Sequence, residues 1–378
     1  MSYLLPLSFP VFDGNESIYI QQVMSSGHLA TSGSFIHKFE SKLSKKVKSH
    51  QAVALNSGTS ALHLGLVLLG IGAGDEVICQ SFTFCASANP IVYLGGTPIF
   101  VDSERDTWNI DPEILEDAIL SRIALGKKPK AIVVVHLFGM PAKMNEILAI
   151  ANKYNIPVLE DAAEAVGSTY EGQYCGAMGK LGVYSFNGNK IITTGGGGAL
   201  LSNDASLVER AKYLSTQARE DLPFYQHLEI GYNYRMNNMA AAIGLAQLEK
   251  LEAWVEKRRL INERYRSLLE NVPGITFQTE SDFSKSNYWL TTVLIDEKLS
   301  GISNDRLRVI LFKAGIETRF LWKPLHLQPV YKYAPFYGGN VSEKMFLQGL
   351  CLPSSVSLTF EDQKMICGLI EKELSKIY

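Results

Sequence analysis

A lysine stands at an unusual place in this sequence. Lys190 follows an apolar run at residues 182–186 and precedes four consecutive glycines at residues 195–198. Lysine side chains prefer a solvated surface, so a lysine that leaves a predicted buried strand needs a reason. A desolvated lysine has a lowered pKa and becomes a nucleophile that forms Schiff bases. The other interpretation is an ordinary surface lysine, which is much the commoner kind.

Two carboxylates end a second apolar run. Glu160 and Asp161 follow Pro157 through Leu159, and small residues come after them. We predict that Asp161 lies at the carboxyl end of a strand, where open α/β sheets bind their ligands. A carboxylate there can pair with a protonated pyridine nitrogen. The alternative is that Asp161 only caps the next helix.

A third segment, residues 56–63, has the character of a phosphate cup. It reads Asn-Ser-Gly-Thr-Ser-Ala-Leu-His and is predicted to join a strand to a helix. The first turn of a helix carries unpaired N–H groups, and with the helix dipole these bind anions. Gly58 permits a close approach of the backbone, and Thr59 and Ser60 add hydroxyl donors. The alternative is a plain helix cap.

The elements around these motifs alternate between strands and helices. Apolar runs predict strands at Ala52–Leu55, Glu76–Cys79, Pro98–Val101, Ala131–His136, Pro157–Glu160 and Gly182–Phe186. Helical patterns lie at Ser60–Gly70, Ala86–Leu94, Asp111–Leu125 and Met144–Tyr154. This alternation predicts an α/β fold whose sheet is largely parallel and covered on both faces. All three motifs then fall at strand ends, which is the layout of an aspartate-aminotransferase-like site for pyridoxal phosphate.

The pattern changes near Asn238. A long helical pattern covers Met239–Leu269, and beyond it a strand at Tyr288–Ile295 and a helix at Asp305–Ala314 are predicted. We therefore expect two domains, a large domain over residues 1–245 and a smaller C-terminal α+β domain over residues 246–378.

Composition excludes several classes of function. The formal net charge of the 378 residues is −2, so no overall field attracts nucleic acid or an anionic membrane. The five cysteines show no C-x-x-C spacing, so we expect no metal site and a reducing compartment. The first fifteen residues lack the pattern of a signal peptide, and no apolar stretch reaches the ~20 residues of a membrane span. We expect a cytoplasmic protein.

With these motifs in order, the sequence resembles the DegT/StrS family of nucleotide-sugar aminotransferases over nearly its whole length. The resemblance rests on ordered blocks at residues 25–28, 33–40, 56–63, 106–111, 136–139, 160–163, 185–190, 231–236 and 324–329. It implies the fold of aspartate aminotransferase (fold type I of pyridoxal phosphate enzymes) and a homodimer with shared active sites.

The resemblance also implies roles for individual residues. Lys190 would form the Schiff base and then move the proton, Asp161 would pair with the pyridine nitrogen, and Phe84 would stack on the ring. The remaining cofactor-binding residues would be Gly58, Thr59, Ser60, Glu164, Ser185 and Asn187, with Asn233 reaching the phosphate of the neighbouring subunit. The nucleotide-sugar would lie near Trp322, His326 and Arg235.

Three features depart from the common family pattern. Glu164 stands where the family commonly has Gln, Gly196 replaces a frequent Glu, and the loop at 187–189 reads Asn-Gly-Asn. A second carboxylate beside the cofactor's phenolic oxygen needs a hydrogen bond or a proton. The departures are similar to the subgroup that aminates C4 of UDP-4-keto-6-deoxy-N-acetylhexosamines on the route to N-acetylbacillosamine.

The sequence therefore predicts transfer of the amino group of L-glutamate to C4 of such a UDP-sugar, for surface polysaccharide or glycan synthesis. Alternatives within the family are a GDP- or dTDP-linked keto-deoxysugar of the perosamine or 3-amino type. A sugar dehydratase of this fold would carry His at position 190, and Lys190 argues against it. A regulatory protein that binds pyridoxal phosphate without turnover is the rival from another class.

Overall fold

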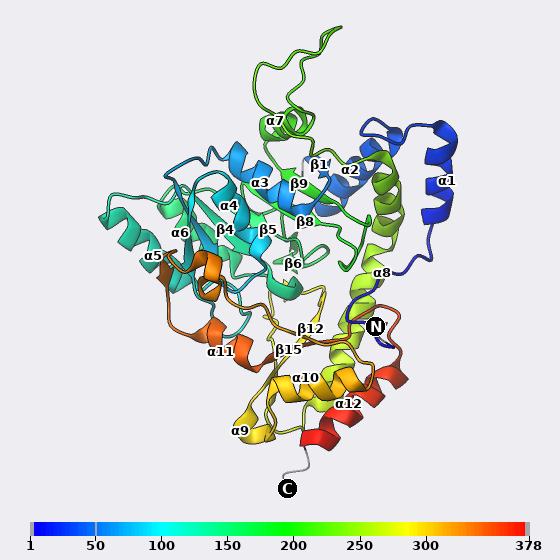
Figure 1. Cartoon of the computed structure of the whole chain (residues 1–378), viewed down its shortest axis with the longest axis vertical. Coiled ribbons are helices and arrows are strands. Elements are labelled where there is room, and N and C mark those ends of the chain that lie inside the picture. The colour runs from blue at the N-terminus through cyan, green and yellow to red at the C-terminus, as the bar shows by residue number, and fades with distance from the viewer. Residues whose placement is uncertain (1–3, 50, 375–378) are drawn as a thin grey trace.

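The computed structural model describes residues 4–49 and 51–374, so the outer ends of the two predicted domains lie outside the described residues. Its centre is an eight-stranded sheet with the order β1-β9-β8-β5-β4-β2-β3-β14 (Figure 1). The strands are β1 (Gln51–Leu55), β2 (Glu76–Gln80), β3 (Thr97–Val101), β4 (Ala131–Val135), β5 (Val158–Asp161), β8 (Leu181–Ser185), β9 (Gly198–Ser202) and β14 (Phe336–Tyr337).

The direction of the strands decides where the predicted motifs meet. Strand β9 runs antiparallel to both β1 and β8, and the other pairs are parallel. Strands β1, β2, β4, β5 and β8 therefore all end at the same edge of the sheet. The chain segments that follow them converge there, as the prediction of a largely parallel sheet requires.

Alternate side chains of the strands pack on opposite layers of helices. Val53 and Leu55 of β1 face one layer, while Ala52 and Ala54 face the other. The first layer holds α3 (Gly58–Leu68), α4 (Asn89–Tyr93) and α7 (Ala205–Ser215), and the second holds α1 (Glu16–Ser26), α2 (Ser34–Val47), α5 (Pro112–Ala124) and α6 (Met144–Lys153). Burial of both faces explains why the strands read as continuous apolar runs.

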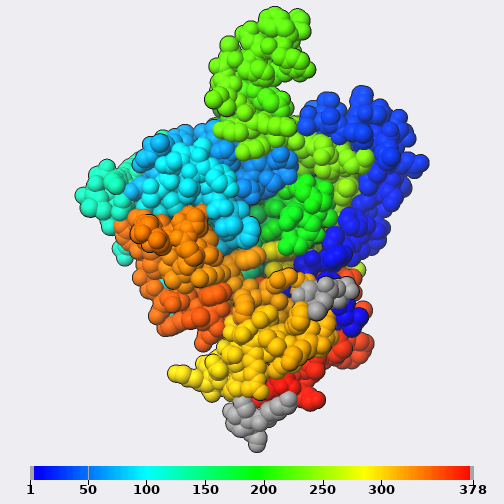
Figure 2. Space-filling view, in the orientation of Figure 1, coloured from blue at the N-terminus to red at the C-terminus, as the bar shows by residue number. Residues whose placement is uncertain are grey.

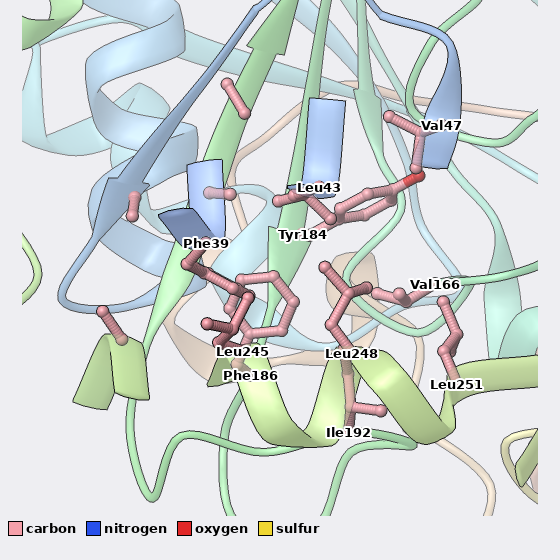
Figure 3. Close-up of a cluster of buried hydrophobic side chains, with 14 of the residues drawn as sticks. Phe39, Leu43, Val47, Val166, Tyr184, Phe186, Ile192, Leu245, Leu248 and Leu251 are labelled. Carbon is pink, nitrogen blue, oxygen red and sulfur yellow. The ribbon is translucent and has the colours of Figure 1, made fainter. Parts of the chain in front are cut away.

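The long helix α8 (Asn238–Leu269) belongs to the second layer at its N-terminal half. There Leu245, Leu248 and Leu251 point toward Tyr184 and Phe186 at the end of β8 (Figure 3). Each buried leucine of this kind contributes about 1.5–3 kcal/mol of hydrophobic stabilisation. This packing fixes the end of β8, from which the segment to Lys190 starts.

The second half of α8 packs on a smaller C-terminal unit. Its sheet has the order β10-β12-β15-β13 and is covered by α10 and α12 (Figure 1). The elements are β10 (Ile275–Phe277), β12 (Thr291–Ile295), α9 (Glu297–Ser300), α10 (Asn304–Lys313), β13 (Arg319–Phe320), α11 (Val341–Gln348), β15 (Gly349–Leu352) and α12 (Phe360–Leu374). The predicted boundary at residue 245 falls inside α8 and stays a prediction.

Short strands and 3-10 turns complete the chain. They are η1 (Cys85–Ser87), η2 (Leu137–Gly139), β6 (Thr169–Tyr170), β7 (Gln173–Tyr174), β11 (Ser284–Lys285), η3 (Leu325–Leu327) and η4 (Pro329–Tyr331). The helix predicted over 86–94 was wrong as one element, since η1 precedes α4 and Pro90 lies in the first turn of α4. The strand predicted from Tyr288 begins at Thr291, because Tyr288 has a positive φ of 43°.

One segment stands clear of the body. The chain after α7, around residues 219–231, projects from the large domain (Figures 1 and 2, light green). It carries Phe224, Tyr225, Leu228 and Ile230, which are 62–87% exposed. Apolar side chains gathered on a projection are typical of a surface that contacts another protein.

Candidate active site

The carboxyl edge of the central sheet surrounds a cavity of about 340 Å³. The segments that follow β1, β2, β5 and β8 form its walls, and Val135 at the end of β4 lies in its floor. The C-terminal unit closes one side through Trp289 and Trp322. A volume of this size suits a small cofactor.

Lys190 lies in the cavity with its side chain only 13% exposed. A turn closed by the hydrogen bond from the Lys190 N–H to the Asn187 carbonyl, 3.0 Å, returns the chain toward the site. The Nζ atom lies 3.9 Å from the centre of the Trp289 ring. Burial lowers the pKa of Lys190, although Glu164 and Asp161 act in the opposite direction. A buried amine with a lowered pKa is a better nucleophile than a surface lysine.

Asp161 is buried at the end of β5 and also lines the cavity. Ser87 Oγ donates to Oδ2 at 2.7 Å, and the Ala163 N–H donates to Oδ1 at 3.1 Å. Desolvation raises the pKa of Asp161, while these two donors and the nearby Lys190 lower it. The donors stabilise the ionised form, and so the carboxylate can hold a proton on a bound ring nitrogen.

The turn at Ser57–Ser60 has the cup geometry that the sequence predicts, with one difference. Ser57 caps α3 by accepting the Ser60 N–H at 3.0 Å, which leaves the N–H groups of Gly58 and Thr59 without an acceptor inside the helix. A Cβ at Gly58 would lie 3.0 Å from the Ser185 side chain, so the loop end of β8 packs tightly here. Gly58, Thr59 and Ser185 all line the cavity.

Ser60 is the difference. Its Oγ accepts the Ser57 N–H at 3.1 Å, which completes a capping box, and its hydroxyl donates to Asn56 Oδ1 at 2.5 Å. Ser60 does not line the cavity, so the structure gives this hydroxyl to the helix cap instead of the predicted phosphate contact.

Glu164 brings a second carboxylate close to the lysine. Its Oε1 lies 3.7 Å from Lys190 Nζ, and its Oε2 accepts the Phe138 N–H at 2.6 Å. Desolvation raises the pKa of Glu164 more than Lys190 and the Phe138 N–H lower it. The sequence analysis requires a hydrogen bond or a proton for a carboxylate at this position. The Phe138 N–H supplies the hydrogen bond, and the Lys190 ammonium lies nearby.

Two aromatic side chains border the mouth of the cavity. The rings of Phe84 and Trp322 lie 5.2 Å apart, and Phe84 is half exposed. Both line the cavity together with Asn187, which is exposed. A flat ligand in the cavity would have Phe84 beside one of its faces.

Besides Ser60, three predicted site residues lie outside this cavity. His326 Nδ1 bonds to Ser81 Oγ at 2.7 Å, and its ring stacks on Phe336. Asn233 is exposed beside the projecting segment and accepts from Gln217 at 3.1 Å. Arg235 is buried against Glu40 and the Ala54 carbonyl, so its guanidinium is committed to the fold and the substrate contact predicted for it needs correction.

The sequence analysis missed Ser87, Thr83 and Trp289, all of which line the cavity. Thr83 Oγ1 and Ser87 Oγ lie 2.9 Å apart, so the pair forms a hydroxyl relay that leads to Asp161. The sequence indicates Ser87 only weakly as a site residue, because its position after β2 is the one feature that predicts a location at the carboxyl edge of the sheet. Trp289 had no local signal, because it reaches the site from the C-terminal unit.

The residues present fit pyridoxal phosphate. Free N–H groups at Gly58 and Thr59 suit a phosphate, Asp161 suits a protonated ring nitrogen, and Lys190 presents a buried amine to the aldehyde. Fold and site together define a pyridoxal phosphate-dependent aminotransferase of fold type I.

Comparisons with known proteins identify the family. Residues 11–371 match the model of the DegT/DnrJ/EryC1/StrS aminotransferase family. EpsN of Bacillus subtilis (strain 168), assigned as a pyridoxal phosphate-dependent aminotransferase, is 46% identical over 96% of this chain and 94% of its own length. The GDP-perosamine synthase of Escherichia coli O157:H7 is 37% identical over 98% of this chain and 99% of its own.

Solved structures agree with this result. A DegT DnrJ EryC1 StrS aminotransferase from Brucella abortus superimposes with a TM-score of 0.90 at 33% identity, covering 96% of each chain. The aminotransferase TlmJ from Streptoalloteichus hindustanus gives 0.91 at 30% identity, covering 99% of this chain and 100% of its own. The chain belongs to the DegT/DnrJ/EryC1/StrS aminotransferase family, and it is a sugar aminotransferase that uses pyridoxal phosphate. The predicted fold class, family and cofactor are thereby confirmed.

Proposed function

We propose that this enzyme moves the amino group of L-glutamate to C4 of a UDP-4-keto-6-deoxy-N-acetylhexosamine. The reaction has two halves: glutamate gives up its amino group and leaves as 2-oxoglutarate, and the amine then replaces the keto oxygen of the sugar. The arrangement of Lys190 and Asp161 in one buried cavity carries the proposal. The product would be a UDP-4-amino-sugar for surface polysaccharide or glycan synthesis.

When bound, pyridoxal phosphate supplies an aldehyde and a protonated ring that withdraws electrons from the reacting carbon. Lys190, whose amine lies in the cavity with a lowered pKa, would bind the aldehyde and would then be placed to accept and return the proton of the reacting carbon. Asp161, held by Ser87 and Ala163, would keep the ring nitrogen protonated. Gly58, Thr59 and Ser185 line the cavity and would hold the phosphate, and Phe84 would pack against the ring.

Three features of the sequence decide which nucleotide we propose. The UDP assignment rests on Glu164, Gly196 and the 187–189 loop, which resemble the subgroup acting on UDP-linked sugars. A GDP-linked substrate is the second candidate, because GDP-perosamine synthases match over 97–98% of the chain. For both candidates, Trp322, which lines the cavity, would contact the sugar, and His326 is proposed as a second contact.

A screen of sugar-nucleotides distinguishes these candidates. The enzyme is first converted to its amine form with glutamate, which removes the visible absorbance of the bound cofactor. Keto-sugars linked to UDP, GDP and dTDP are then added separately, and the return of that absorbance is followed. We expect the fastest return with the UDP-4-keto-6-deoxy-N-acetylhexosamine. A faster return with a GDP-linked sugar would favour the second candidate, and no return with any sugar would reject both.

The working unit is proposed to be a homodimer with shared active sites. The exposed apolar side chains of the projecting segment would pack on a second copy of the chain. Asn233, at the base of that segment, would then reach the phosphate site of the partner, which explains why it lies outside its own cavity.

We further propose that the enzyme acts in the cytoplasm, where nucleotide-sugars are made. All five cysteines are unpaired thiols, as a reducing compartment favours. In the described part of the chain, no helix has both the length and the apolar character to cross a bilayer.

A further inference from the structure

A second pocket adjoins the catalytic cavity. It has a volume of about 510 Å³ and shares Asn189, Trp289 and Trp322 with the cavity as common walls. The other polar residues that line it are Ser8 of the N-terminal segment, Glu317, and Arg319 of β13. Lys190 Nζ lies 3.9 Å from the centre of the Trp289 ring, so only this ring separates the reacting amine from the second pocket.

A buried positive charge stands directly behind this pocket. Arg258 of α8 is 2% exposed and donates to the Trp289 carbonyl and, at 3.0 Å, to Ser8 Oγ. Its Nε has no hydrogen-bond acceptor, and within residues 4–49 and 51–374 it forms no ion pair with a carboxylate. Burial lowers the pKa of Arg258 to about 9, so the group is still cationic at neutral pH.

This charge is unusual because buried charges in proteins are normally paired. Both residues that accept its hydrogen bonds, Trp289 and Ser8, line the pocket. An anion in the pocket would therefore receive the attraction of a cation that water screens poorly.

A second guanidinium stands at the rim. Arg319 has a side chain 63% exposed, and its Nε and Nη2 both bond to Glu317 Oε1, at 3.1 and 2.8 Å. Glu317 also accepts the Leu7 N–H at 3.0 Å. Arg319 thus balances the charge of Glu317, and in the described part of the chain its Nη1 makes no hydrogen bond. The unbalanced charge at the pocket is the positive one of Arg258.

We propose that this pocket binds the distal carboxylate of a dicarboxylic amino donor, with Arg319 as the contacting residue and Arg258 as the buried charge behind it. The inference rests on the proposed function, in which glutamate is the donor. The amine of the donor takes the place of the Lys190 amine beside Trp289. Its two methylenes carry the far carboxylate past that shared wall, where Nη1 of Arg319, which Glu317 does not occupy, can donate a charged hydrogen bond to it.

The two half-reactions allow a direct test with Arg319→Gln. L-glutamate and L-alanine are compared as donors, and the loss of the cofactor's visible absorbance is followed in a stopped-flow instrument. Loss of one charged hydrogen bond should weaken the glutamate reaction about ten-fold or more and leave the alanine reaction within about two-fold. Lys153→Gln is the matched control, because Lys153 has a side chain equally exposed at 63% and also pairs with a glutamate.

An equal effect on both donors, or no effect on either, would overturn the proposal. A wild-type enzyme that reacts with alanine as readily as with glutamate would overturn it too. None of these results would affect the amination of keto-sugars, so failure of this inference is distinct from failure of the proposed function.

Binding supplies a second readout that needs no turnover. Glutarate, which has two carboxylates and no amine, should bind the wild-type holoenzyme in a calorimeter and bind Arg319→Gln about ten-fold more weakly. The diphosphate of the nucleotide-sugar is the other anion that the pocket could take. If Arg319→Gln weakens binding of UDP and leaves glutarate unchanged, the pocket belongs to the diphosphate and the proposal fails.

Discussion

Lys190 Nζ lies 3.7 Å from Glu164 Oε1, and both groups are buried in the same cavity as Asp161. The cavity therefore holds two carboxylates and one amine whose pKa values are shifted toward the neutral forms by burial. Such a cluster is costly for folding and typical of a catalytic site. Four predictions concern these three groups and the Ser87 hydroxyl that contacts Asp161, and a fifth concerns the proposed dimer.

The first concerns the lysine itself. Lys190→Ala should abolish turnover and the visible absorbance of the bound cofactor, because no other lysine within residues 4–49 and 51–374 lines the cavity. The fold should stay intact, since the change removes a desolvated group, and circular dichroism would check this. Lys180→Ala, at an exposed lysine paired with Asp204, is the control and should keep full activity. Activity of the Lys190 variant near that of wild type would refute the assignment.

The second concerns the ring nitrogen. Asp161→Asn should lower kcat roughly 100-fold, since a neutral amide holds the ring proton far less well than a carboxylate does. The cofactor should still bind, because the phosphate contacts are elsewhere. Steady-state kinetics and the cofactor content of the purified variant measure the two effects. An unchanged rate would place the partner of the nitrogen at another residue.

The third concerns Ser87, whose hydroxyl donates to Asp161 at 2.7 Å. Ser87→Ala removes a donor that favours the ionised carboxylate, so the pKa of Asp161 should rise further and kcat should fall about ten-fold. The absorbance of the bound cofactor, followed against pH, should show a lowered pKa of the ring nitrogen. Ser44→Ala on α2, whose hydroxyl bonds to the Ser41 carbonyl, is the control. A slower enzyme with an unaltered pH profile would mean that Ser87 acts only in packing.

The fourth concerns Glu164 and stability. Because the folded-state pKa of Glu164 is raised above its ordinary value of 4.5, the folded protein binds more protons than the unfolded chain above that pH. The contribution of Glu164 to the free energy of unfolding therefore falls as pH rises through this window. Glu164→Gln should remove the cost: in cofactor-free protein, the variant should gain stability over wild type between pH 4.5 and neutrality.

Urea unfolding of both proteins at pH 5 and pH 7.5 measures this difference. A variant less stable than wild type at pH 7.5 would show that the ionised carboxylate gains more from Lys190 than it loses through burial.

The fifth concerns the proposed dimer. Lys190→Ala and Asn233→Ala should each lose activity, yet a mixture of the two that has exchanged subunits should recover up to about a quarter of wild-type activity. Each mixed dimer would contain one site with neither change. Mixing Lys190→Ala with Asp161→Asn is the control and should recover nothing, provided both residues act in the same subunit's cavity. Recovery absent from the first mixture would contradict a shared site.

Much of the site was predictable because its residues sit at strand ends. Asp161 closes β5 and Gly58 follows β1, and strands buried on both faces produce apolar runs that can be recognised without a structure. In a largely parallel sheet the carboxyl ends share one edge, so these motifs had to meet.

What the sequence determined by itself was the family, the fold class and the order of the chemical groups along the chain. What only the tertiary structure decided was the partner of each group. The Ser60 hydroxyl bonds within a helix cap, and Arg235 pairs with Glu40. Trp289, from the unit that begins after α8, packs against the Lys190 amine. Local pattern fixes which residues end a strand, whereas side-chain direction and contacts between distant segments depend on how the two units pack.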